Sequence, residues 1–171
     1  AAGLSGSLSV RENVQRLAQY YQENIPYSYR PGATPYQEDF VNYFLTKNRR
    51  GYCAHFASAA TLAFRYIGIP ARYVEGYAVD PQDVSEEGTI EYDEKYEAYY
   101  EGTSEVGKTA VVSVNVTDAN AHAWVEVYDE SLGWQVADVT PVSGEKEEDN
   151  GLWKRILNFL GAGGNSQDDT G

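Results

Sequence analysis

The 171-residue sequence is short of cysteine and of basic residues. With one cysteine, Cys53, no intramolecular disulfide can form, which fits the cytosol and is equally compatible with a place outside it. Lys and Arg number 13 against 26 Asp and Glu, and the formal net charge is −13. Because phosphate binding needs clustered Lys and Arg, we expect no nucleic-acid partner.

Long apolar runs and metal-binding spacings are also missing. The sequence has no run of about 18 apolar residues, so we expect that this chain does not span a membrane. The segment Cys53-Ala54-His55 lacks the spacing of zinc ligands, and the acidic stretch 86–101 lacks that of an EF-hand. We therefore expect neither a metal nor any other cofactor. The start, Ala1-Ala2-Gly3, has no Met and no signal-peptide pattern, and we interpret it as the processed or trimmed start of an excerpt from a longer protein.

Apolar and aromatic residues are abundant. Hydrophobic residues make up 42% and aromatic residues 13% of the chain, which is enough for a packed core without covalent staples. Tyrosine occurs fifteen times. Because Tyr packs a ring and keeps a polar tip, we expect many of these side chains to be half-buried on sheets or along a cleft.

The hydrophobic pattern predicts helices in the first half of the chain and strands in the second. A capping-box pattern at Ser9 and Glu12 marks the first helix. Helices followed by strands indicate an α+β fold, in which helices pack on one side of an antiparallel sheet. The predicted helices are 10–23, 38–46 and 52–67, and the predicted strands are 71–79, 110–116, 121–128 and 134–139.

The predicted domain covers residues 9–143. Within it, the acidic, Tyr-rich stretch 81–108 shows no clear period and is predicted to be a long surface excursion. An acidic linker (144–150), a short amphipathic helix (152–160) and a disordered tail (161–171) are predicted to follow the domain.

Cys53 is the candidate nucleophile. It lies at the predicted start of a helix that is apolar on nearly all sides and is therefore expected to be buried. A helix start carries partial positive charge and free N–H groups, which favour a thiolate and can stabilise an oxyanion on an attacked carbonyl. The alternative is an inert, buried cysteine, which is common in proteins.

His122 is the predicted general base. Residues i and i+2 of a helix point away from each other, so His55, the other of the two histidines, cannot face the Cys53 thiol. Alternation along the predicted strand 121–128 puts His122 and Trp124 on the face opposite the apolar core face. Imidazole titrates near neutrality and suits reversible proton transfer. A structural, hydrogen-bonded histidine is the alternative.

Asp138 is the predicted partner of the base. If the hairpin turn is centred near Glu130, His122 and Asp138 lie directly opposite each other, with Cβ atoms about 4.5–5.5 Å apart. A turn centred on Ser131 makes them diagonal neighbours on the same face, whereas the register between these two puts them on opposite faces. Asp118 is nearer to the base in sequence but lies in a predicted loop.

Four blocks in this order resemble the bacterial transglutaminase-like superfamily, and in particular the branch whose domain sits on the outer face of membrane-anchored proteins. Val139 stands where such proteins often have Pro. The blocks are Gly51-Tyr52-Cys53-Ala54-His55-Phe56-Ala57-Ser58-Ala59, Gly68-Ile69-Pro70-Ala71-Arg72-Tyr73-Val74-Glu75-Gly76-Tyr77, Ala121-His122-Ala123-Trp124-Val125-Glu126-Val127, and Gly133-Trp134 with Asp138-Val139-Thr140-Pro141.

The resemblance implies a papain-like fold and a Cys-His-Asp triad, which carries over to Cys53, His122 and Asp138. It also implies an extracytoplasmic enzyme that attacks protein or peptide amides, forms a thioester and passes the acyl group to an amine or to water. A protease or deamidase without amine transfer, and a binding module that has lost turnover, stay open as alternatives. Tyr52 and Trp124 are candidate substrate-binding residues, with packing as the alternative for the strand aromatic.

Overall fold

The computed structural model describes residues 2–79, 84, 88–98 and 107–141. The described residues divide into two compact units, one drawn from 2–76 and 122–141 and the other from 77–79, 84, 88–98 and 107–121. The linker predicted at 144–150, the helix at 152–160 and the tail at 161–171 lie outside the described residues. In the part of the chain that is described, no helix is both long enough and apolar enough to cross a membrane.

Helix α1 spans Val10–Asn24, as the hydrophobic period predicts. Its capping box is present: the Ser9 hydroxyl accepts a hydrogen bond from the Glu12 N–H (3.2 Å), and the Glu12 carboxylate accepts one from the Ser9 N–H (3.0 Å). The buried face of the helix consists of Asn13, Val14, Leu17 and Tyr21.

The helix predicted at 38–46 is two segments. Helix α2 spans Phe40–Tyr43 and is capped by Asp39, whose side chain accepts from the Asn42 N–H at 2.8 Å. It passes into a π-helical turn, η1, at Phe44–Asn48. The turn closes with a hydrogen bond from the Arg49 N–H to the Phe44 carbonyl (2.9 Å), which spans five residues instead of four.

Helix α3 spans Cys53–Tyr66 and starts where the sequence predicts. Gly68 follows its end with φ of 89°, which suits the residue after a helix C-cap. The expectation that this helix is buried on all sides is wrong, because Leu62 is 51% and Tyr66 is 92% exposed. One side of the helix contributes to the core through Phe56, Ala59, Ala60 and Phe64.

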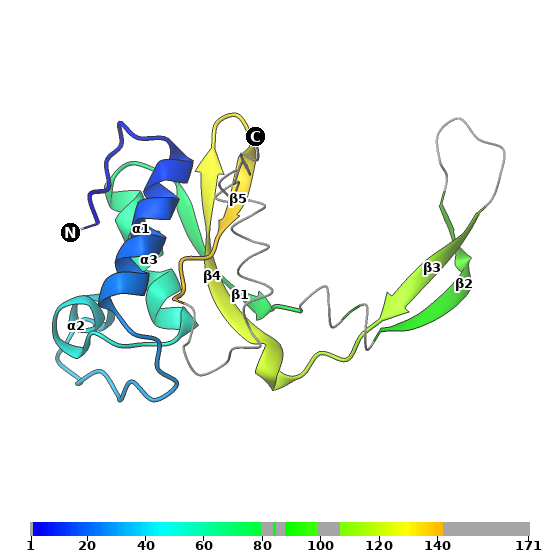
Figure 1. Cartoon of the computed structure of the whole chain (residues 1–171), viewed down its shortest axis with the longest axis horizontal. Coiled ribbons are helices and arrows are strands. Elements are labelled where there is room, and N and C mark those ends of the chain that lie inside the picture. The colour runs from blue at the N-terminus through cyan, green and yellow to red at the C-terminus, as the bar shows by residue number, and fades with distance from the viewer. Residues whose placement is uncertain (1, 80–83, 85–87, 99–106, 142–171) are drawn as a thin grey trace, which may run out of the picture. The chain divides into compact units, whose positions relative to one another are not determined.

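Three strands form the sheet of the first unit, in the order β1-β4-β5. Their bounds are Ala71–Tyr77 for β1, Ala121–Asp129 for β4 and Gly133–Ala137 for β5, and β4 pairs antiparallel with β5. The helices lie against one face of this sheet (Figure 1). That face carries Ala123, Val125 and Val127, which are at most 3% exposed, so the opposite face is the one that carries His122.

The second unit is a two-stranded antiparallel ribbon of β2, Thr89–Ala98, and β3, Gly107–Ser113. The sequence pattern predicted a long surface excursion over 81–108 and did not indicate β2 within it, and the strand predicted at 110–116 begins three residues earlier. Along β2, Ile and Tyr residues alternate with charged residues, as in a strand. A register shift between Asp93 and Glu97 interrupts the pairing with β3.

A backbone hydrogen bond joins the segment by which the chain enters the second unit to the segment by which it leaves. The Ala78 N–H donates to the Asn120 carbonyl at 2.8 Å, and the Asn120 side-chain amide donates back to the Ala78 carbonyl at 3.4 Å. A short 3-10 turn, η2, at Asp118–Asn120 leads from this unit into β4.

Candidate active site

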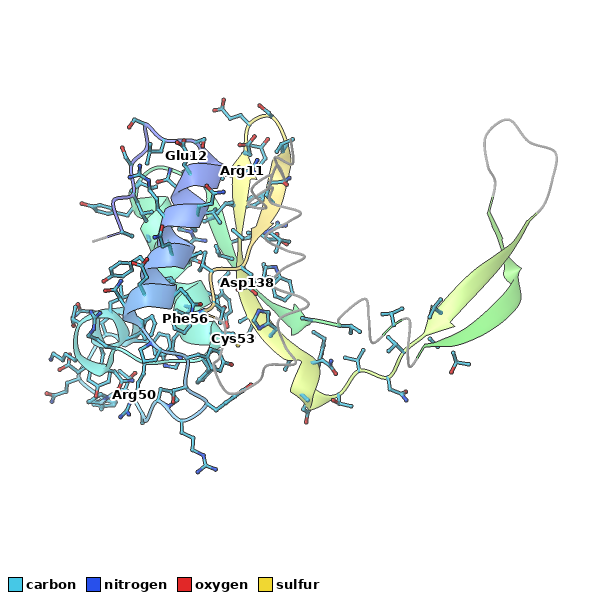
Figure 2. The ribbon with its side chains drawn as sticks, in the orientation of Figure 1. Arg11, Glu12, Arg50, Cys53, Phe56 and Asp138 are labelled. Carbon is cyan, nitrogen blue, oxygen red and sulfur yellow. The ribbon has the colours of Figure 1, made fainter. Side chains whose placement is uncertain are left out.

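Cys53 is the first residue of α3, and its side chain is partly exposed. The preceding segment is fixed by a parallel bridge between Tyr27 and Gly51 and by a hydrogen bond from the Ser28 N–H to the Gly51 carbonyl (2.7 Å). Figure 2 labels Cys53 at the start of α3 and Asp138 just after β5. The thiol therefore lies at the positive end of a helix, as the sequence predicts.

His122 contacts Asp138 directly, through its Nε2 and the carboxylate Oδ2. The second carboxylate oxygen, Oδ1, accepts a hydrogen bond from the Thr140 N–H at 3.0 Å. The Asp138 side chain is only 4% exposed and that of His122 is 21% exposed. Both oxygens of the buried carboxylate are thus engaged, which fixes the orientation of the carboxylate and, through it, of the imidazole.

The register of the β4–β5 hairpin explains why the two side chains meet. Asp129 pairs with Gly133 and Val125 with Ala137, so the turn is centred on Ser131. This is the diagonal alternative of the two registers that put His122 and Asp138 on one face. The turn itself is fixed by the Asp129 carboxylate, which accepts from the N–H groups of Ser131 (2.8 Å) and Leu132 (3.1 Å).

The environment of His122 favours its protonated form. Burial acts to lower the pKa of the imidazole, but hydrogen bonds to Asp138 and Cys53, together with the negative charges of those two groups, outweigh burial and raise the pKa to about 10. Because Nε2 is occupied by Asp138, Nδ1 is the ring nitrogen left for Cys53. The structure therefore brings the three predicted residues together around one imidazole.

Other carboxylates do not take the place of Asp138. Glu126 lies on the same face of β4, but its Oε2 accepts from Arg72 at 2.6 Å. The Arg72 guanidinium also lies over the Trp134 ring, 4.3 Å from its centroid. Asp118 belongs to η2 in the other unit. Among the described residues, no group of three or more His, Cys, Asp or Glu side chains could hold a metal ion.

Two tyrosines near the thiol were not predicted from the sequence. Burial and then the negative charge of Cys53 raise the pKa of Tyr27. For Tyr73, burial is again the largest cause that raises the pKa, followed by its hydrogen bond to Glu75, with a further contribution from Cys53. The abundance of Tyr was the available signal, but no local pattern distinguishes these two from the other thirteen.

The two candidate substrate-binding residues lie in different surroundings. Trp124 is half-buried beside His122, with ring centroids 6.2 Å apart and planes tilted by 22°. Its ring is packed so closely on the main chain that a Cβ at Gly76 would come within 2.9 Å of it. Tyr52, which is 39% exposed, instead packs its ring edge-on against His55, with centroids 4.6 Å apart. Trp124 therefore lies next to the imidazole, whereas Tyr52 covers the other histidine.

Comparison with known proteins gives a consistent result. The family model described as the transglutaminase-like superfamily matches residues 1–139. The chain is 30% identical over 136 residues to a protein-glutamine gamma-glutamyltransferase of Pseudomonas aeruginosa, which covers 80% of this chain and 16% of that protein. It is 37% identical over 103 residues to YebA of Bacillus subtilis, an uncharacterized protein, which covers 60% of this chain and 11% of YebA. The chain thus spans less than a fifth of the length of either relative.

Solved structures agree with the sequence relatives. The periplasmic domain of TgpA from Pseudomonas aeruginosa matches with a TM-score of 0.52 and 26% identity, over 88% of this chain and 40% of that one. The same domain bound to ethylmercury gives a TM-score of 0.51 and 29% identity, over 77% and 38% of the two chains. The predicted α+β fold of the transglutaminase-like kind is confirmed.

Proposed function

The chain belongs to the transglutaminase-like superfamily, and on that premise we propose that it is a cysteine acyltransferase that acts on amide groups of a protein or peptide. The observation that supports this most is the arrangement around His122. One ring nitrogen meets the buried carboxylate of Asp138, and the other is left for Cys53 at the start of α3. We propose Cys53 as nucleophile, His122 as proton carrier and Asp138 as the group that orients it.

The first half of the proposed reaction forms a thioester. The Cys53 thiolate attacks the amide carbonyl carbon, and the carbonyl electron pair moves onto oxygen. Main-chain N–H groups in the first turn of α3 stabilise that oxyanion. The intermediate then collapses: the C–N bond breaks, and the proton on His122 Nδ1 passes to the departing nitrogen, which leaves as ammonia or an amine.

The second half returns the enzyme to its starting state. An amine or a water molecule attacks the thioester carbonyl, His122 takes up the proton of the attacking group, and the C–S bond breaks. The thiolate and the imidazolium are restored together. Asp138 stays ionised throughout, keeps the proton on Nε2 and stabilises the positive ring. No cofactor takes part in these steps.

We propose the side-chain amide of glutamine as the acyl donor. The relative in Pseudomonas aeruginosa is named a protein-glutamine gamma-glutamyltransferase, and this chain is 30% identical to it. Transfer to an amine and hydrolysis differ only in which nucleophile reaches the thioester. Because the His122 side chain is 21% exposed, water also has access, so hydrolysis is the second candidate. A peptidase that cleaves main-chain amides and a silent binding module of the same fold are the remaining alternatives.

We propose that the domain works outside the cytoplasm, on the outer face of a membrane-anchored protein. Two observations support this location: two of the solved structures that match are of the periplasmic domain of TgpA, and the curated relatives are several times longer than this chain. At that location its partners are protein or peptide substrates, and nucleic acid is not among them.

An amine-incorporation assay tests the proposal. The chain is incubated with a glutamine-containing peptide and a fluorescent primary amine, and products are identified by mass spectrometry. We expect the peptide–amine adduct with release of ammonia, and deamidated peptide when the amine is omitted. Cys53→Ala should abolish both products while circular dichroism shows an unchanged fold. Full activity of Cys53→Ala would exclude the mechanism, and cleavage of the peptide backbone would favour the peptidase.

A further inference from the structure

His55 lies on the same helix as the proposed nucleophile and has no part in the reaction described above. It is 5% exposed. Burial lowers its pKa, so the ring is neutral at neutral pH. Three aromatic rings surround it. They belong to Phe40 of α2 (4.6 Å between centroids), Phe44 of η1 (5.3 Å) and Tyr52 (4.6 Å).

Two hydrogen bonds join His55 to the residue just before the nucleophile. The His55 N–H donates to the Tyr52 carbonyl at 2.8 Å, and the Tyr52 N–H donates to His55 Nδ1 at 3.4 Å. Tyr52 is the N-cap of α3 and His55 is the third residue of the helix. This is the position from which Glu or Gln reaches back to the N-cap N–H in a capping box. The imidazole therefore takes the place of that side chain.

Gly51 holds the imidazole against the backbone from the other side. A Cβ at Gly51 would lie 2.6 Å from His55 Cβ, 2.7 Å from His55 Cγ and 2.9 Å from Phe44 Cε2. No side chain fits there without displacing the ring. The backbone from Gly51 to Cys53 is thus held by close packing at one end and by the Tyr52 hydrogen bonds in the middle.

We propose that His55 is a positioning residue for Cys53: by accepting the Tyr52 N–H it fixes the peptide that enters α3 and so the direction of the Cys53 side chain. The inference rests on the proposed function, because it gives His55 a part in the geometry of that same nucleophile. Without the acceptor, the Tyr52 N–H joins the unsatisfied donors of the first turn, and that turn frays. Cys53 is the first residue of the turn and moves with it.

The role requires one tautomer. Nδ1 must carry the lone pair that accepts from Tyr52, so the proton lies on Nε2. Nitrogen-15 spectra of the unmodified chain distinguish the two forms, because a protonated and an unprotonated ring nitrogen resonate far apart. We expect an unprotonated Nδ1 in His55. A proton on Nδ1 at neutral pH would overturn the inference without any variant.

Two substitutions distinguish the contribution of the hydrogen-bond acceptor in His55 from that of its aromatic ring. His55→Gln keeps an acceptor at the third helical position, whereas His55→Phe keeps an aromatic ring and removes the acceptor. The readout is the rate at which iodoacetamide alkylates Cys53, measured by mass spectrometry at about pH 7, where the thiolate is the reactive form. Thermal unfolding of each variant checks that it is folded.

We expect His55→Gln to react within about threefold of the unmodified chain, and His55→Phe to react about tenfold more slowly, the size of effect that the loss of one helix cap gives. If both variants react at the original rate, or both are equally slow, the inference is wrong. Its failure is distinct from that of the proposed function. The proposed function fails if Cys53 of the unmodified chain is alkylated no faster than Cys53 of His122→Gln, whatever His55 does.

Discussion

Asp138 holds His122 by Nε2 although the two residues are not paired across the hairpin. The ladder between β4 and β5 pairs Val125 with Ala137, so its continuation sets Asp138 opposite Trp124 and diagonal to His122. A carboxylate reaches a ring two positions along the neighbouring strand because diagonal neighbours on one face stay within reach of long side chains. The same geometry places the Trp124 ring beside the imidazole.

Asp138→Asn should therefore lower the rate of amide turnover by about 10⁴-fold while the fold stays intact. The amide keeps the shape of the carboxylate but cannot stabilise the imidazolium, and it favours the wrong tautomer of His122. Turnover of the glutamine peptide and thermal unfolding are to be measured side by side.

Glu126→Gln is the matched control for that substitution. Glu126 lies on the same face of β4 but pairs with the half-exposed Arg72. Losing such an ion pair costs about 0.2–1 kcal/mol and should leave turnover nearly unchanged. An equal loss of turnover in the two variants would show that removing any negative charge from this face of the sheet slows the reaction, and would contradict the role of Asp138.

The pKa of His122 predicts how stability depends on pH. The pKa is raised from an ordinary value of about 6.5 to about 10 in the folded chain. A folded state that holds a proton more tightly than the unfolded state gains stability that is fully present below about pH 6.5 and is lost as pH rises through 10. Urea unfolding of the unmodified chain and of His122→Gln should give a difference in free energy that shrinks over this range. A difference that grows with pH would contradict the assignment.

Gly51→Ala should affect both stability and the thiol. The added Cβ would lie 2.6 Å from His55, and overpacking of this kind costs about 1–3 kcal/mol. The ring must shift, and the segment that enters α3 shifts with it, so we expect slower alkylation of Cys53. Chemical denaturation and the alkylation rate give the two measurements.

Gly68→Ala provides a comparison with a similar loss of stability at the other end of α3. A Cβ at Gly68 has open space around it, but φ of 89° makes the substitution strained by about 1–2 kcal/mol. We expect this variant to be destabilised and to keep the original alkylation rate. If both glycine variants lose reactivity in proportion to stability, the effect at Gly51 is not local.

Asn13→Ala should loosen the N-terminal segment. Asn13 is fully buried, accepts from the Ser5 N–H at 3.0 Å and donates to the carbonyls of Ser5 (2.9 Å), Leu8 (3.3 Å) and Ser9 (3.1 Å). Removing the amide takes away the side-chain partner of the half-buried Ser5 N–H and Leu8 carbonyl and leaves a space where the fully buried amide was, at a cost of about 1–3 kcal/mol. Limited proteolysis should cut the variant before Ser9 faster than the unmodified chain. Equal cleavage would show that the segment is held by other contacts.

The hydrophobic pattern and the capping signals were enough to predict the elements that carry the candidate site. The starts of α1 and α3 follow from Ser9 and from the apolar run after Gly51, and period-two alternation identifies the face of His122. The pattern did not decide between the two hairpin registers that put His122 and Asp138 on the same face. The sequence contained the deciding feature, since Asp129 two residues before Ser131 closes a turn centred there.

Other features depend on contacts between residues far apart in the chain, and no local pattern reveals them. The proximity of Tyr27 and Tyr73 to Cys53 arises only when three separate segments meet. Strand β2 is rich in charged residues, and for this reason its composition predicted a loop. The pairing with β3 that makes it a strand, with its register shift, is visible only in the structure. Asn13 reads as an ordinary polar position of α1, because the backbone groups that it binds belong to residues without any periodic pattern.

The hydrogen-bonded pair of Ala78 and Asn120 lets the chain depart from the core and return at a single point. An insertion joined in this way can lengthen, shorten or be replaced without altering the register of β1 or β4, because the entropy of closing a loop grows only slowly with its length. Evolution can therefore vary this module while the nucleophile, the base and the carboxylate keep their places.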